Sequence, residues 1–580
     1  MSNLRIVLFS NVRATRTCRV ADRLMREIPG VKVSGIAQRP LQSLPLEQRL
    51  IATTESHLPF VFSQAQSGMQ RRVYSMLAHV IHGVLWFVHG CPRTVNSRNQ
   101  FTISRLAEEC QQSGCRFLLT DSDDNDALCD FVRASNADLV IMLGDIPMSP
   151  ELMQSPLRGL IRAFQDKSSS IAKESIQLIV EYAKTGSDSA IPVASFKVPI
   201  QSYDALPGLT LKLDLISDDL LVQTVKNIVG DAEKASGAVR EWIDKMFSPY
   251  VAQIDSSERS RMAVVRSVYR CRSVWKLCME TLLLCSPFFV WRNWYRRWRS
   301  QYPVLILAHH LISDRPHRMG TSTTTFWHLI CFLKKHYHIV SLSEASQLLR
   351  SGNVTRPTVV ITFDDGYGEN FINMRAVAEE AGIPVVLFVS TEPVDDHREF
   401  HHDVVQGAVG ALPLTWDQIR YWSMRGAEFG SHTRTHFDCG SNDRARLKSE
   451  IMGSKSDLEA QLGKPVRFFA FPFGKQDNMS CEAMELATTT YSYFASCFGG
   501  NNMPDEASNQ QHLLRKNFYS DLWELELELQ SVFDLTDRIR RQFIRKPAKE
   551  SDSSLNDLST APTLAMNGER GQVLPANEVT

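Results

Sequence analysis

The stretch that decides the fold of this 580-residue chain is Val359-Val360-Ile361-Thr362-Phe363-Asp364-Asp365-Gly366. Its apolar, β-branched start predicts a buried strand that ends at two adjacent carboxylates and a glycine. Neighbouring side chains on an extended strand point in opposite directions. Asp364 and Asp365 can therefore do different jobs, one binding a metal ion and the other holding a proton. A strand followed by a polar turn is the alternative interpretation, because Asp and Gly are common turn residues.

A second polar segment follows downstream, Phe429-Gly430-Ser431-His432-Thr433-Arg434-Thr435-His436. The spacing predicts that His432 and His436 lie on one face of a helical turn, close enough to bind one metal ion. Asp365 supplies a carboxylate to complete the set. Two histidines and one carboxylate, with positions left for water, are the usual ligands of a hydrolytic metal site. A histidine pair by itself is more often a packing or surface feature.

A third segment is an apolar strand that begins with Arg and ends in Pro-x-Gly, Arg467-Phe468-Phe469-Ala470-Phe471-Pro472-Phe473-Gly474. Arg467 can pair with a carboxylate near the metal. The turn at its end can present a backbone N–H to an oxyanion. An ordinary strand and turn would have the same pattern.

In this order, the three segments closely resemble the motifs of the polysaccharide deacetylases with a NodB-type catalytic domain. That family's motifs are Thr-Phe-Asp-Asp-Gly, then His-Ser/Thr-x-x-x-His or a close variant, then Arg-x4-Pro-Tyr/Phe-Gly. The resemblance covers residues 301–545. It implies an α/β fold for this domain, a distorted (β/α)7 barrel.

The resemblance also implies a role for each motif residue. Asp364 would be the general base, and Arg467 would orient it. A divalent metal, zinc before nickel, cobalt or manganese, would polarise the acyl carbonyl and lower the pKa of the attacking water. The metal ligands would be Asp365, His432 and His436, and the N–H of Phe473 would join the oxyanion hole.

The candidate for the family's general acid lies at a different place in this sequence than in many members. Many members carry a late Leu-x-x-His whose histidine protonates the leaving amine, and Gln511-His512-Leu513-Leu514-Arg515 fits that pattern poorly. The opening strand 303–310 instead resembles that of permuted members, such as the biofilm poly-N-acetylglucosamine deacetylases, in which the acid histidine comes first. His310 is therefore the candidate acid, and His309 stands where those members have Tyr. A strand-end histidine without a catalytic role is the alternative.

A histidine-rich cluster lies between the first and second motifs. His397, His401, His402 and Asp403 carry groups that bind metal ions. Family members often have two aromatic residues and an Asp here, so a loop that shapes the substrate groove is the favoured interpretation.

Residues 1–235 alternate between strand and helix patterns. The predicted elements are strands at 4–10, 31–36, 117–120 and 138–143, and helices at 17–28, 101–113 and 126–135. Such alternation predicts a Rossmann-type α/β domain with a parallel sheet.

Part of this first domain resembles the formyltransferases that use a folate formyl donor, on the run Asn136–Gly144 with Pro150–Met153, and on 198–200 and 214–228. That family expects Asn-x-His-Pro-Ser after a glycine, but this chain has Arg162 and Phe164 where the Asn and His would stand. The resemblance therefore implies a domain that no longer transfers formyl groups. It would bind a partner or substrate, or support the second domain.

Residues 236–300 are predicted to be a helical linker, in which the stretch 259–299 mixes aromatic with basic side chains. The stretch 72–95 is also apolar, and neither reaches the roughly 18–20 apolar residues of a spanning helix. Aromatic and basic residues together suit an interfacial helix on anionic lipid. A linker packed between two domains, with solvated arginines, is the alternative.

Composition limits the remaining possibilities. The chain has 64 basic and 64 acidic residues, which predicts no polyanionic partner, and it carries no nucleic-acid-binding motif. Twelve cysteines without C-x-x-C pairs favour a reducing compartment, and the first apolar run is too short for a signal peptide. We therefore expect a cytoplasmic protein, with peripheral attachment to the inner membrane face if the linker binds lipid. Residues 546–580 are poor in large apolar side chains, which predicts a disordered tail.

These features predict a metal-dependent hydrolase that removes an N-acyl group from an amino sugar of a polysaccharide or a lipid-linked glycan precursor. Acetyl is the expected group, and the formyltransferase resemblance adds formyl by analogy. The short first apolar run and the basic-aromatic stretch point to a lipid-linked precursor at the inner membrane face, and from this we expect a role in bacterial exopolysaccharide or surface-glycan biosynthesis. The alternative is a non-catalytic binding or scaffold protein in a glycan-assembly complex, for which a complete ligand set has no physical purpose.

Overall fold

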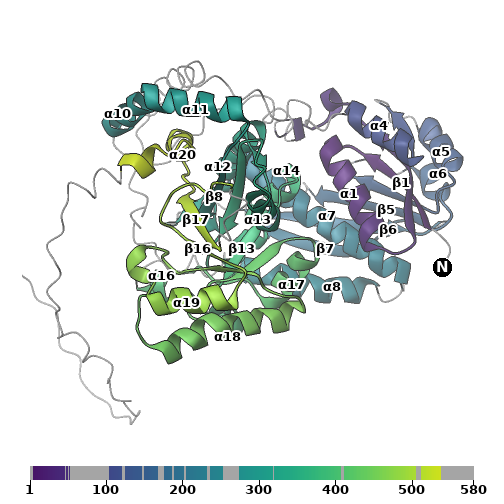
Figure 1. Cartoon of the computed structure of the whole chain (residues 1–580). Coiled ribbons are helices and arrows are strands. Elements are labelled where there is room, and N and C mark those ends of the chain that lie inside the picture. The colour runs from purple at the N-terminus through teal and green to yellow at the C-terminus, as the bar shows by residue number, and fades with distance from the viewer. Residues whose placement is uncertain are drawn as a thin grey trace, which may run out of the picture. The chain divides into compact units, whose positions relative to one another are not determined.

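The fold contains two large β-sheets (Figure 1). A computed structural model describes residues 4–45, 48–49, 51, 103–120, 125–144, 146, 149–166, 175–185, 189–200, 204–230, 235–252, 274–315, 317, 319–405, 410–504 and 511–536. Met1–Phe533 forms one compact unit, which holds both sheets, and Asp534–Thr580 forms a second. The apolar stretch 72–95 and the expected tail at 546–580 lie outside the described residues. The domain boundaries expected near residues 235, 300 and 545 remain a prediction.

The first sheet has the strand order β3-β2-β1-β4-β5-β6-β7. Its strands are β1 (Leu4–Ser10), β2 (Val31–Gln38), β3 (Arg116–Leu119), β4 (Leu139–Leu143), β5 (Gly159–Asp166), β6 (Ser175–Ala183) and β7 (Ile191–Pro199). The strands from β3 to β5 are parallel, as the α/β alternation predicts. β6 and β7 pair antiparallel, so the sheet is mixed. The short connection between these two strands permits a hairpin, whereas parallel neighbours need a longer crossover.

The helices of this part are α1 (Ala14–Glu27), α4 (Ile103–Ser113), α5 (Asn125–Ala134), α6 (Pro150–Gln154), α7 (Leu206–Gly230) and α8 (Ala235–Met246), with a 3-10 turn at Leu41–Ser43. The 25-residue α7 is buried along most of its length. It contacts β5, β6 and β7 of the first sheet as well as α12 and α14 around the second. A helix that is apolar on several faces needs partners on several faces, so α7 packs between the two sheets.

The second sheet closes into a barrel of seven parallel strands, which confirms the predicted (β/α)7 fold. The strands are β8 (Val304–His309), β12 (Thr358–Phe363), β13 (Val386–Val389), β14 (Glu428–Ser431), β15 (Phe468–Ala470), β16 (Tyr493–Ser496) and β17 (His512–Asn517). β8 pairs with both β17 and β12, which closes the ring. The short β11 (His338–Ile339) also pairs with β12, and β9 (Leu311–Ile312) pairs with β10 (Gly320–Thr321). Every residue of β8 and β12 is buried, as expected for strands covered on both faces.

The helices around the barrel follow the β/α alternation (Figure 1). They are α10 (Val274–Leu284), α11 (Pro287–Arg299), α12 (Thr323–His336), α13 (Leu342–Arg350), α14 (Asn373–Ala381), α15 (Thr391–Asp396), α16 (His401–Val404), α17 (Trp416–Met424), α18 (Arg444–Leu462), α19 (Cys481–Thr490) and α20 (Leu522–Leu529), with 3-10 turns at Gly368–Phe371 and Gln476–Asn478. None of the helices in the described part of the chain is long and apolar enough to cross a bilayer.

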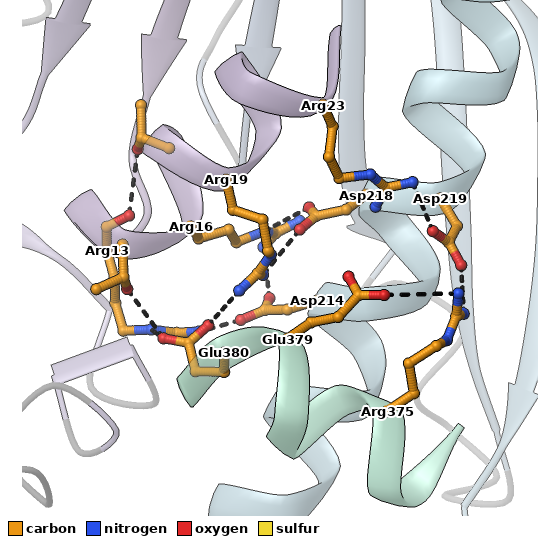
Figure 2. A network of polar contacts seen from close by, with 12 residues as sticks. Arg13, Arg16, Arg19, Arg23, Asp214, Asp218, Asp219, Arg375, Glu379 and Glu380 are labelled. Carbon is orange, nitrogen blue, oxygen red and sulfur yellow. Dashed lines mark hydrogen bonds and ion pairs between the residues drawn. The ribbon is translucent and has the colours of Figure 1, made fainter. Parts of the chain in front are cut away.

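A buried network of charges joins α1 and α7 to α14 of the barrel (Figure 2). Its members are Arg13, Arg16, Arg19 and Arg23 on α1 and its N-terminal flank, Asp214, Asp218 and Asp219 on α7, and Arg375, Glu379 and Glu380 on α14. Arg23 and Arg375 both donate to the buried carboxylate of Asp219. Since α14 follows the Asp364-Asp365 pair closely in sequence, the first sheet supports the barrel at an element next to those carboxylates.

Candidate active site

Four polar motif residues and His310 gather at one end of the barrel because they follow its strands. Asp364 and Asp365 come directly after β12, His310 follows β8, and His432 follows β14. The carboxyl ends of parallel barrel strands all meet at the same end. Side chains from three separate strands therefore converge there, and His436 lies on the loop after β14.

Three of these side chains are arranged to hold one metal ion. The Nε2 atoms of His432 and His436 lie 3.5 and 3.3 Å from Oδ1 of Asp365, and the three ligand atoms fall within 4.8 Å of one another. That carboxylate oxygen is buried without a hydrogen-bond partner among the described residues. Nδ1 of His432 donates to the carbonyl oxygen of Ala470 at 2.8 Å, which leaves Nε2 with its lone pair for a metal. The donor set fits a divalent metal such as zinc.

A loop, and not the helical turn that the spacing predicted, brings the two histidines together. His432 and His436 are not on a helical turn, because Thr433 and His436 have positive φ values of 65° and 59°. Asp365 and Phe473, at 69° and 60°, also adopt this left-handed conformation. Each such residue costs about 1–3 kcal/mol. Strained backbone at four positions around one site indicates that the surrounding fold holds the ligands in place.

Burial and charge set the protonation of the ligands. Burial would raise the pKa of Asp365, but the imidazoles around it, His436 foremost, hold this pKa below its usual range. Burial lowers the pKa of His436 to about 3 and also lowers that of His432, against the pull of the nearby carboxylates. At neutral pH the site therefore presents an ionised carboxylate and two neutral imidazoles, the forms that bind metals.

The counter-ion of Asp364 is Arg515 on β17, and the prediction that Arg467 orients this carboxylate is wrong. Arg515 donates from Nη1 to Oδ1 at 2.6 Å and from Nη2 to Oδ2 at 2.8 Å. Burial would raise the pKa of Asp364, but the guanidinium beside it keeps this pKa below its usual value. Arg467 instead precedes β15, at the opposite end of the barrel, where it is exposed and donates to Ser343 at 2.7 Å.

The two adjacent histidines at the end of β8 differ in environment. His309 is fully buried and stacks on Phe518, and burial lowers its pKa to about 3. His310 is close enough to Asp364 and Asp365 that its charge would lower the pKa of both carboxylates. Nδ1 of His310 is buried with no hydrogen-bond partner among the described residues. This position suits a group that exchanges a proton with a substrate, and the general-acid role of His310 remains a prediction.

His402 is a residue of the site that the sequence analysis assigned to a groove loop. Its Nε2 lies 3.7 Å from Oδ2 of Asp365, and its ring centroid lies 4.3 Å from that of His436. Tyr367 contacts Nε2 of His402 at 3.2 Å and donates to Asp403 at 2.6 Å. Through these contacts the tyrosine holds the histidine-rich loop next to the site. The histidine-rich sequence was the available signal, but only the fold shows which histidine faces the metal ligands.

The loop after β15 contacts the same site. The ring of Phe473 packs edge-on against His436, with 4.8 Å between centroids. Gly474 has a φ of +60°, and a Cβ atom there would lie 2.7 Å from the backbone nitrogen of Cys497. This close approach explains the glycine of the Pro-x-Gly sequence. The oxyanion role of the Phe473 N–H remains a prediction.

The residues that replace the formyltransferase motif interact with each other. The guanidinium of Arg162 lies 4.1 Å from the ring centroid of Phe164, and Nη2 of Arg162 pairs with Glu181 of β6 at 2.9 Å. These contacts stabilise the sheet.

Comparison with known proteins finds a family match in the barrel. Residues 351–492 match the family model described as polysaccharide deacetylase. The chain is also similar to "Putative polysaccharide deacetylase YxkH" of Bacillus subtilis (strain 168), with 24% identity over 150 residues. That alignment covers 26% of this chain and 49% of the relative, so the chain spans about half the length of this curated relative.

Comparison with solved structures also finds matches to parts of the chain. The Streptococcus pyogenes deacetylase PplD in complex with acetate matches with a TM-score of 0.34 and 18% identity, over 40% of this chain and 99% of that one. Glycinamide ribonucleotide transformylase 1 from Symbiobacterium toebii matches with a TM-score of 0.24 and 10% identity, over 39% of this chain and 87% of that one.

Proposed function

We propose that this chain is a metal-dependent hydrolase that removes an N-acyl group from an amino sugar, a proposal supported by the match of residues 351–492 to the polysaccharide deacetylase family model. The group is acetyl or formyl, and the sugar belongs to a polysaccharide or a lipid-linked glycan precursor in bacterial surface-glycan biosynthesis. The observation that supports this best is the meeting, at one end of the barrel, of the Asp365-His432-His436 ligand set with the Asp364–Arg515 pair.

Each residue has a task in amide hydrolysis. A bound divalent metal would polarise the acyl carbonyl and lower the pKa of the attacking water. Asp364, held ionised and oriented by Arg515, takes a proton from that water, whose oxygen bonds to the acyl carbon. The N–H of Phe473 donates to the carbonyl oxygen as it gains negative charge. His310 gives a proton to the nitrogen as the C–N bond breaks, so that the products are a carboxylic acid and a free amine.

The test is metal-dependent release of acetate and formate from N-acetyl and N-formyl amino-sugar oligomers. The full chain is stripped with a chelator, and zinc, cobalt, nickel or manganese is added back. We expect metal to restore release in the wild type. Asp364→Asn should retain the metal but lose about 10²–10⁴-fold in kcat, the usual contribution of a general base.

The matched control is Asp396→Asn, which changes an exposed aspartate of α15 in the same way. This variant should keep full activity. A folded, metal-loaded wild type that releases neither acid, from soluble or lipid-linked substrates, would contradict the hydrolase and favour the binding or scaffold protein. The identity of the released acid decides between deacetylation and deformylation.

A further inference from the structure

Helix α11 carries a row of aromatic side chains that the fold leaves in solvent. Phe288, Trp291, Trp294, Tyr295 and Trp298 are between 40% and 67% exposed. At 3.6 residues per turn they occupy an arc of about 120° on the helix. Trp291 stacks on Tyr295, and Trp294 on Trp298, with ring centroids 5.4 and 6.1 Å apart. We call these five residues the aromatic face of α11.

The opposite side of α11 is the one that packs on the barrel. Phe289 is buried, and Arg292 and Asn293 bond to Gln530, which ends α20. These contacts fix the rotation of the helix, so the exposure of the aromatic face is set by the fold. Neighbouring α10 exposes Trp275, Met279 and Leu282 in the same spacing.

The charge around the aromatic face has one sign. Between residues 274 and 299 the chain has five basic residues and one acidic residue, Glu280, which is buried. Arg297 and Arg299 are exposed on either side of the aromatic arc, and neither has a carboxylate partner among the described residues. A soluble surface would normally mix signs and avoid contiguous aromatic groups.

We propose that α11 is an interfacial membrane-binding helix whose aromatic face inserts at the headgroup level of an anionic bilayer, with Arg297 and Arg299 on lipid phosphates. Tryptophan and tyrosine favour this depth because their rings are apolar with one polar atom. Flanking arginines gain attraction to an anionic surface. A protein partner would need acidic side chains placed along the whole helix, whereas an anionic leaflet presents negative charge over its whole surface.

This surface and the catalytic residues lie at opposite ends of β8. Arg297 and Arg299 precede the strand and His310 follows it, and its six residues span about 20 Å. Membrane contact through α11 therefore leaves the metal site open. Binding to vesicles needs no turnover, so its outcome is independent of the proposed hydrolase activity.

The experiment is co-sedimentation of the full chain with vesicles of phosphatidylcholine, with and without phosphatidylglycerol. We expect binding to the anionic vesicles alone, weakened by added salt. Replacing Arg297 and Arg299 with glutamine should reduce affinity about fivefold per arginine, or about 25-fold together. The triple change Trp291→Ala, Trp294→Ala and Trp298→Ala should abolish binding.

Matched controls are Leu157→Ala and Met424→Ala, which remove exposed apolar side chains elsewhere, at 72% and 80% exposure. Both should bind like the wild type. Three results would overturn the proposal: no binding to either vesicle, binding that the arginine and tryptophan changes leave intact, or wild-type self-association that the tryptophan changes remove. The last result would identify the face as a contact between copies of the chain.

Discussion

Replacing Arg515 with methionine should move the acid limb of the pH–activity profile to higher pH. Asp364 is 3% exposed, and the guanidinium of Arg515 meets both of its oxygens. An opposite charge at this distance lowers a carboxylate pKa by about 1–3 units, and burial alone raises it. Without the guanidinium, burial acts alone, so we expect the pKa of Asp364 to rise and the acid limb to move up with it.

The assay is kcat/KM against pH for the metal-loaded wild type, Arg515→Met and Arg515→Lys. The lysine variant keeps the positive charge but cannot bind the carboxylate in a bidentate manner. Its acid limb should therefore fall between those of the wild type and Arg515→Met. Arg467→Met is the matched control, because it removes an arginine that is exposed at the other end of the barrel. It should leave the profile unchanged.

Thermal stability gives a readout that does not depend on turnover. The folded-state pKa of Asp364 is lowered, so the ion pair stabilises the wild type above the ordinary carboxylate pKa, and this stabilisation is lost as pH falls through the lowered value. In Arg515→Met the folded-state pKa is raised, so ionisation of the buried carboxylate destabilises the fold as pH rises. The Tm difference between the two proteins should therefore be larger at pH 8 than at pH 5. Superimposable acid limbs, or a Tm difference independent of pH, would refute the reasoning.

Three further substitutions test the site and its support. His402→Phe should lower metal affinity about 10–100-fold in equilibrium dialysis, because its imidazole faces a metal ligand; unchanged affinity would remove His402 from the site. Asp219→Asn should destabilise the chain by about 3–5 kcal/mol in thermal unfolding, because its buried arginine partners lose their counter-charge. The control Asp130→Asn, which changes an exposed aspartate, should alter stability by less than about 0.5 kcal/mol. Gly474→Ala should lower Tm more than Gly463→Ala: both have positive φ, but only Gly474 lacks space for a Cβ. Equal losses for the two glycine variants would show that the close approach to Cys497 is unimportant.

Sequence patterns were informative where the relevant contacts are local. Alternating strand and helix signals predicted the parallel strands of the first sheet, because the period of apolar residues reports directly on which face is buried. The barrel was expected from the resemblance of three motifs to a known family. The antiparallel hairpin of β6 and β7 was not identified, since strands 175–183 and 191–199 lie beyond the segments whose patterns were clear. The helical turn expected at His432–His436 is a loop with left-handed residues, a conformation that spacing alone does not indicate.

The sequence by itself identified Asp365, His432 and His436 as a candidate ligand set, and the structure brings these side chains together at one end of the parallel barrel. The tertiary structure alone decided which arginine holds Asp364. Closure of the barrel places β17 beside β8, which in turn pairs with β12, and brings Arg515 to the carboxylate from 151 residues away. It also decided that His402 faces the site and that α1 and α7 neutralise charges on α14. Such pairs depend on how distant elements pack, and no local period or propensity records that arrangement.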